Sequence, residues 1–67
     1  MRKIVSHEFE YDLHALVELS RYVLESFQDE MCEDVLSSLQ KADASIASAY
    51  VHVRSDYLDQ HGDELNN

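Results

Sequence analysis

The sequence contains no proline, no tryptophan, one glycine and one cysteine. A single cysteine cannot form an intramolecular disulfide, and a single glycine excludes the glycine-rich loops that hold phosphate groups. No apolar run approaches the roughly 18 residues of a membrane span, and only Ile4 and Val5 follow the basic start, too few for a signal peptide. We therefore expect a protein of the reducing cytoplasm that makes no contact with a membrane.

Positive charge is also scarce, because five Lys and Arg stand against 14 Asp and Glu in 67 residues, a formal net charge of −9. Proteins that hold nucleic acid by neutralising phosphates need the opposite balance, so we expect no direct binding to nucleic acid. A chain of this length buries only about 60% of its unfolded surface when it folds alone. Self-association is therefore expected.

Two stretches of the chain show the periodicity of amphipathic helices, with stripe positions at alternating spacings of four and three. The first stretch predicts a helix over residues 7–27, with Ser6 as its N-cap. The second predicts a helix over 30–61, followed by Gly62 as a terminating residue. The stripe positions are Phe9, Leu13, Leu16, Ser20, Val23 and Phe27 in the first helix and Val35, Leu39, Ala42, Ile46, Ala49 and Val53 in the second.

The connection between the helices lacks the Gly and Pro that usually mark a tight turn. Asp29, as an N-cap followed by carboxylates, favours a break and hence an all-α helical hairpin. One alternative is a single long coiled-coil helix that continues through Met31. A second alternative is a strand over residues 5–12 followed by two helices, as in ribbon-helix-helix DNA-binding dimers, although its exposed positions would present carboxylates to DNA.

In the hairpin, residue i is expected opposite about residue 58 − i, which places Phe9 near Ala49 and lets the second helix extend beyond the first. We expect one small helical domain over residues 1–67, with 1–6 as an N-terminal arm and 62–67 as a frayed acidic tail.

A lone hairpin leaves half of each apolar stripe uncovered, which favours a homodimer that forms a four-helix bundle. Such an assembly resembles, in form only, the small RNA-binding hairpin dimers of the Rop family. No motif carries the RNA-binding residues of that family into this sequence, whose outward faces are acidic.

No sequence motif of nucleophilic or phosphate chemistry is present, so we expect no enzymatic activity and no cofactor. Cys32 falls on the apolar stripe at the start of the second helix and is expected in the core. Two sets of metal-ligating residue types have i, i+4 spacing, namely Glu10, His14 and Glu18, and His52 with Asp56. We interpret both sets as parts of solvated polar faces rather than as a metal site.

Asp43 borders the apolar stripe of the second helix, where a partner such as His14 would help to fix the register of the hairpin. We favour the simpler interpretation, in which Asp43 lies at the edge of the stripe and reaches water. The four histidines, His7, His14, His52 and His61, stand at polar positions. A pH-dependent assembly is the alternative that they offer, but we do not expect it.

The candidate partner-binding residues are aromatic residues and their neighbours. Tyr11 and Tyr22 lie on the side of the first helix opposite Phe9, with Glu18 and Glu25 beside them, and aromatic residues are enriched in protein interfaces. The second candidate patch lies on the extended end of the second helix. The alternative to partner binding is burial there, either beneath residues 1–6 or in the homodimer. It contains Tyr50, Val53, Arg54, Tyr57 and Leu58.

These features together indicate a small acidic, non-enzymatic regulator or inhibitor that acts as a homodimer and binds another protein. The alternative is a nucleic-acid mimic whose carboxylates imitate phosphates and block the basic groove of a DNA- or RNA-binding protein, with an attraction that falls as salt rises. Its mimetic residues would be Glu8, Glu10, Asp12, Glu18, Glu25, Glu30, Glu33, Asp34, Asp56, Asp59 and Asp63.

Overall fold

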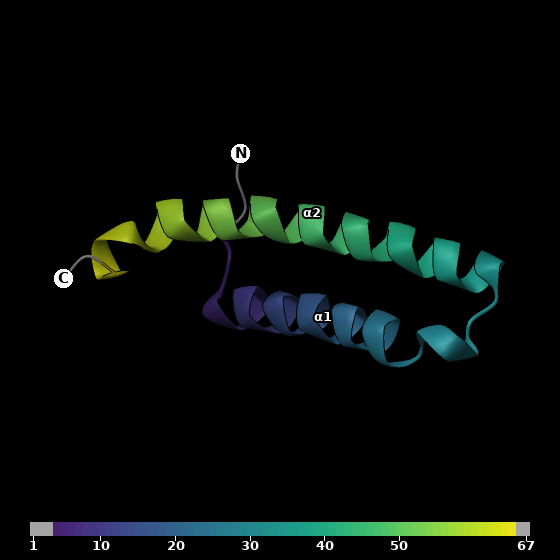
Figure 1. Ribbon diagram of the computed structural model, residues 1–67. Helices are drawn as coiled ribbons and strands as arrows, with labels where there is room; N and C mark the ends of the chain where they lie inside the picture. The colour runs from purple at the N-terminus through teal and green to yellow at the C-terminus, as the bar shows by residue number, and fades with distance from the viewer. Residues whose placement is uncertain (1–3, 66–67) are drawn as a thin grey trace.

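The computed structural model describes residues 4–65, which form a hairpin of two antiparallel α-helices (Figure 1). Helix α1 spans His7–Ser26, the short 3-10 helix η1 spans Gln28–Glu30, and α2 spans Glu33–Leu65. No strand occurs in this part of the chain. The predicted all-α hairpin is confirmed, whereas the single long helix and the ribbon-helix-helix arrangement are wrong.

Helix α1 begins at the residue that the sequence predicts. Ser6 has extended backbone angles (φ −76°, ψ 158°), and its hydroxyl accepts a hydrogen bond from the backbone N–H of Phe9 at 3.0 Å. This side chain satisfies one of the N–H groups that a helix start leaves without a partner. Ser6 is therefore the N-cap of α1.

The connection between the helices is longer than predicted. Helix α1 ends at Ser26, and η1 follows before the chain becomes extended at Met31. Asp29 lies inside η1, so its predicted role as an N-cap is wrong. The last turn of α1 holds no basic residue that would stabilise the negative C-terminal end of the helix. Carboxylates follow, and they would destabilise a continuation of α1. The same charges favour a new helix start, because Glu33 and Asp34 lie in the first turn of α2, at its positive N-terminal end. Charge, rather than Gly or Pro, thus accounts for the break.

Two expectations near the ends of α2 are corrected. Cys32, which directly precedes α2, is exposed, so its predicted place in the core is wrong. Helix α2 continues through Gly62 to Leu65, so its predicted end at residue 61 is also wrong. Gly62 has a helical rather than a left-handed backbone, because no glycine in the described chain has a positive φ. Residues 1–3 of the expected arm and 66–67 of the expected tail lie outside the described residues.

Replacing Gly62 with alanine is expected to raise the free energy of unfolding by up to about 0.5 kcal/mol. An added Cβ would meet no heavy atom within 4 Å. The gain comes from the smaller backbone entropy of the unfolded chain. Urea denaturation followed by circular dichroism measures it, and a loss of stability would instead mean that Gly62 terminates the helix.

The core of the hairpin is small. Three apolar side chains, Val5, Val17 and Tyr57, are buried, and none of the described side chains is less than 2% exposed. Val5 belongs to the segment before α1, which crosses α2 near its C-terminal end (Figure 1). There the backbone N–H of Val5 donates to the side-chain oxygen of Gln60 at 2.8 Å, and the Val5 carbonyl oxygen accepts from the Nε2 atom of His61 at 3.0 Å. The N-terminal segment is thereby attached to α2.

The register of the two helices differs from the predicted one. His7 pairs with Tyr57, His14 with Tyr50, and Ser20 with Asp43. Each partner lies five or six residues further along α2 than expected. The longer connection accounts for part of this shift, because α2 begins at residue 33 rather than at the predicted residue 30. His7, at the start of α1, therefore contacts Tyr57. The sequence places Tyr57 on an extension of α2 that either residues 1–6 or a second copy covers.

The apolar stripe predicted for α1 is only partly turned toward α2. Leu13, Ser20 and Val23 are half-buried, but Phe9 and Leu16 are exposed. Val17, predicted to flank the stripe, is instead the buried residue of α1. The contact with α2 is thus rotated toward the side of α1 that carries Glu10.

Candidate functional site

The candidate binding surface on α1, here called the tyrosine face, consists of Tyr11, Glu18, Tyr22 and Glu25. Tyr11 is 71% exposed and Tyr22 is 59% exposed, and both carboxylates are also exposed. Their spacings of seven, four and three residues place them along one side of the helix. The predicted grouping of these four residues on one exposed helix face therefore agrees with the structure.

Neighbouring side chains hold two members of the tyrosine face in position. The ring of Tyr22 meets that of Phe27 edge to face, with 6.3 Å between the centroids. The Nε2 atom of His14 lies 3.4 Å from a carboxylate oxygen of Glu18 one turn away. Beside this face, an open depression of about 370 Å³ lies between the helices, and it is lined by Arg21, Leu24, Glu25 and Asp43.

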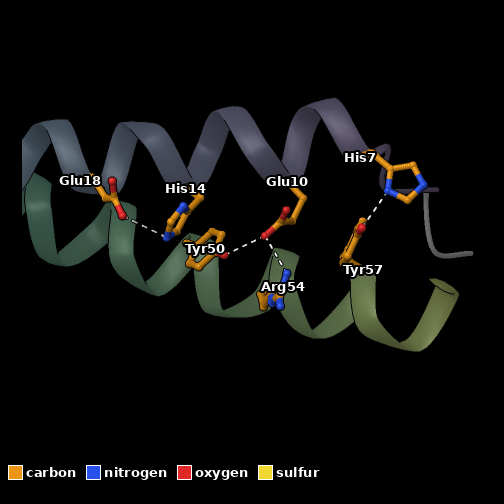
Figure 2. Close-up of polar contacts among 7 residues, drawn as sticks. All are labelled: His7, Glu10, His14, Glu18, Tyr50, Arg54 and Tyr57. Atoms are coloured by element: carbon orange, nitrogen blue, oxygen red, sulfur yellow. Dashed lines mark hydrogen bonds and ion pairs between the residues drawn. The ribbon is translucent and has the colours of Figure 1, made fainter. Parts of the chain in front are cut away.

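The second predicted patch does not form one exposed surface. Tyr57 is buried at 8% exposure, and Tyr50 and Val53 are half-buried. Arg54 and Leu58 are exposed. Tyr50 and Arg54 both bond to Glu10 of α1, so these two side chains and Tyr57 contribute to the contact between the helices (Figure 2).

Glu10 is the centre of a polar network in the seam between α1 and α2. The hydroxyl of Tyr50 donates to the Oε1 atom of Glu10 at 2.7 Å, and the guanidinium of Arg54 donates to the same atom at 2.9 Å (Figure 2). The hydrogen bond from Tyr50 lowers the pKa of Glu10 and that from Arg54 acts in the same direction, while desolvation opposes both. The same hydrogen bond has the opposite effect on its donor: it raises the pKa of Tyr50, and desolvation raises that pKa further.

The structure gives Asp43 a different partner from the predicted one. Asp43 is half-buried and accepts a hydrogen bond from the hydroxyl of Ser20 at 2.9 Å. His14 instead packs its ring against that of Tyr50, with 5.3 Å between the centroids. The prediction that His14 pairs with Asp43 is wrong because it relied on the incorrect register.

Two histidines that are far apart in the sequence meet at the open end of the hairpin. The rings of His7 and His61 lie 4.4 Å apart, and both contact the ring of Tyr57. The Nδ1 atom of His7 is hydrogen-bonded to the hydroxyl of Tyr57 at 2.7 Å (Figure 2). Arg54 lies over the ring of the same tyrosine at 5.6 Å.

The acidic and histidine residues with metal-ligand spacing do not gather around a common point. Glu10 is committed to Tyr50 and Arg54, and His14 to Glu18. In residues 4–65, no three His, Cys, Asp or Glu side chains are placed to hold a metal ion together. Within the same range, no helix combines the length and apolar character needed to cross a bilayer.

Sequence reasoning missed the network around Glu10, because its partners depend on the register of α2. The sequence did contain a relevant pattern, since Tyr50, Arg54 and Tyr57 lie on one face of α2 and Glu10 is the carboxylate at the same end of α1. The chain matches no protein-family profile, no curated protein and no solved structure.

Proposed function

We propose that this chain is a cytoplasmic, non-enzymatic regulator or inhibitor that acts as a homodimer and binds another protein through the tyrosine face. The observation that carries the proposal is the exposure of Tyr11 and Tyr22, at 71% and 59%, on a side of α1 that α2 does not cover. Rings that are this exposed bury little area within the hairpin and therefore add little to its stability. At protein interfaces, tyrosine is among the residues that contribute most to binding.

The surroundings of the two tyrosines support binding to a protein with basic groups. Glu18 and Glu25 accompany the rings, in a chain whose formal net charge is −9. Carboxylates at the rim of an aromatic patch speed the encounter with a positively charged partner, and the rings supply the buried area that holds it. The depression lined by Arg21 and Asp43 adjoins Glu25 and offers space for one partner side chain.

The test compares the wild-type chain with the double variant Tyr11→Ala, Tyr22→Ala as bait in lysate of the host. Each ring is expected to contribute about 2 kcal/mol, roughly 30-fold in affinity. Alanine is the better helix former, so the variant keeps its helices. The double variant Ser45→Ala, His52→Ala, on the exposed outer side of α2, is the matched control. We expect one or more proteins to bind the wild type and the control but not the tyrosine variant.

Elution with increasing salt separates this proposal from nucleic-acid mimicry. A complex held by aromatic rings survives an increase in ionic strength, whereas a phosphate mimic loses its partner as the charges are screened. The surface also offers fewer free carboxylates than a phosphate mimic was expected to have, because Glu10 is paired with Arg54 inside the hairpin. Equal retention by the wild type and the tyrosine variant would refute the tyrosine face as the binding site.

A further inference from the structure

The hairpin carries a second surface, here called the apolar face, of which Val23 is half-buried and the other members are exposed. It consists of Phe9, Leu16, Val23, Val35, Ala42 and Ala49. On each helix its members recur every seven residues. Phe9 is 51% exposed, Leu16 is 45% exposed and Val35 is 46% exposed, and both alanines are exposed as well. Apolar residues that recur every seven positions form a stripe along a helix, and helices pack onto neighbouring helices through such stripes.

The two halves of the apolar face lie on the same side of the hairpin. Glu10 of α1 and Arg54 of α2 form an ion pair along one edge of the contact between the helices. Successive residues of a helix are rotated by about 100° around its axis. Phe9, which precedes Glu10, and Val53, which precedes Arg54, therefore lie toward the edge opposite the ion pair. Because the helices are antiparallel, this step leads to the same edge in both. The hairpin therefore has one polar edge and one apolar edge.

The exposed area of the chain is large enough for a second copy to cover this face. The chain exposes 5429 Å² of surface, whereas a compact monomer of 7.8 kDa exposes about 4400 Å². The excess is about 1000 Å², which is close to the roughly 800 Å² that each partner of a stable complex buries. The excess arises from the elongated shape of the hairpin, which measures 47 × 24 × 15 Å.

We infer that a second copy of this chain covers the apolar face, so that two hairpins pack face to face into a four-helix bundle. The inference rests on the homodimer of the proposed function and specifies the surface that forms it. A second copy supplies the same apolar surface with the same seven-residue repeat, as a twofold symmetric interface requires. The small side chains of Ala42 and Ala49 allow the facing helices to approach closely. The tyrosine face stays outside this interface and remains accessible.

Sedimentation equilibrium of the full chain tests the inference, in reducing buffer because the exposed Cys32 could cross-link two copies. We expect the wild type to have twice the mass of one chain. Leu16→Glu is expected to weaken the dimer at least about 100-fold, because it places a charge in the apolar interface of both copies. Ala15→Glu adds the same charge at an exposed neighbouring position outside the apolar face and is expected to leave the dimer intact. Added salt should strengthen the wild-type dimer by screening the acidic copies from each other.

Circular dichroism of both variants establishes that the helices remain. If Leu16→Glu lowers the helicity, Ala42→Glu provides the same comparison on α2, at an exposed position. A helical wild type that is monomeric overturns the inference, as does equal dimerisation of Leu16→Glu and Ala15→Glu. The two proposals fail separately. If the wild type is a monomer but still needs Tyr11 and Tyr22 to capture a protein, only the dimer is refuted. If the wild type is a dimer but captures no protein through these tyrosines, only the tyrosine face as the binding surface is refuted.

Discussion

Replacing Tyr57 with alanine is expected to lower the free energy of unfolding by about 3 kcal/mol or more. Tyr57 is one of three buried apolar side chains, and it contacts His7 and His61 as well as Arg54. Its loss removes the ring on which the open end of the hairpin packs. In a chain with so small a core, an effect of this size leaves a large fraction of the molecules unfolded at 25 °C. Thermal and urea unfolding followed by circular dichroism measure the change.

Two further tyrosine variants separate the contributions of the Tyr57 side chain. Tyr57→Phe keeps the ring and loses only the hydrogen bond to His7, so we expect a cost of about 1 kcal/mol. Tyr22→Ala, which truncates a ring that is 59% exposed, is expected to change the stability by less than about 0.5 kcal/mol. If Tyr57→Ala proved as mild as Tyr22→Ala, the packing of the N-terminal segment on α2 would be wrong.

The parts of the fold that the sequence predicts correctly depend on one helix at a time. Ser6 identifies the start of α1 because an N-cap acts within a single turn. The exposure of Tyr11 and Tyr22 follows from the phase of α1 alone, since both lie opposite its apolar stripe. Neither prediction needs the position of α2.

The parts that the sequence does not predict depend on how the two helices meet. The connection contains neither Gly nor Pro, so the extra residues of η1 are not marked, and they displace every pair along the seam. Glu10 was therefore assigned to a solvated face, although it accepts from Tyr50 and Arg54. The sequence likewise places Tyr57 in a partner-binding patch, although the rings of His7 and His61 pack on it. Both errors have the same physical origin, which is an incorrect register.

The register also explains why apolar side chains are exposed in this hairpin. Both helices have an apolar stripe that is wider than one contact, and the Glu10 network occupies one edge of the seam. Polar groups along that edge leave Phe9 and Leu16 on the other. Hydrogen bonds thus align the two helices, while much of the apolar surface of the hairpin stays exposed.

Replacing Glu10 with glutamine is expected to lower the free energy of unfolding at pH 7 by about 1–2 kcal/mol, because two hydrogen bonds lose their charged acceptor. The pKa of Glu10 is lower in the folded chain than its ordinary value. Its contribution is therefore fully present above the ordinary glutamate pKa of about 4.3 and is lost as the pH falls through the lower, folded value. The wild type and Glu10→Gln should consequently differ at pH 7 and converge in acid.

Urea denaturation at a series of pH values and at constant protein concentration measures this convergence. Glu25→Gln, at an exposed carboxylate of the same helix, is the matched control and should differ little from the wild type at any pH. Tyr50→Phe removes the hydroxyl that chiefly lowers the pKa of Glu10, so the acid-dependent part of the stability should shrink in that variant. A constant difference between the wild type and Glu10→Gln from neutral pH to pH values below the folded pKa would show that the carboxylate charge does not stabilise the seam, and that Glu10 contributes through packing alone.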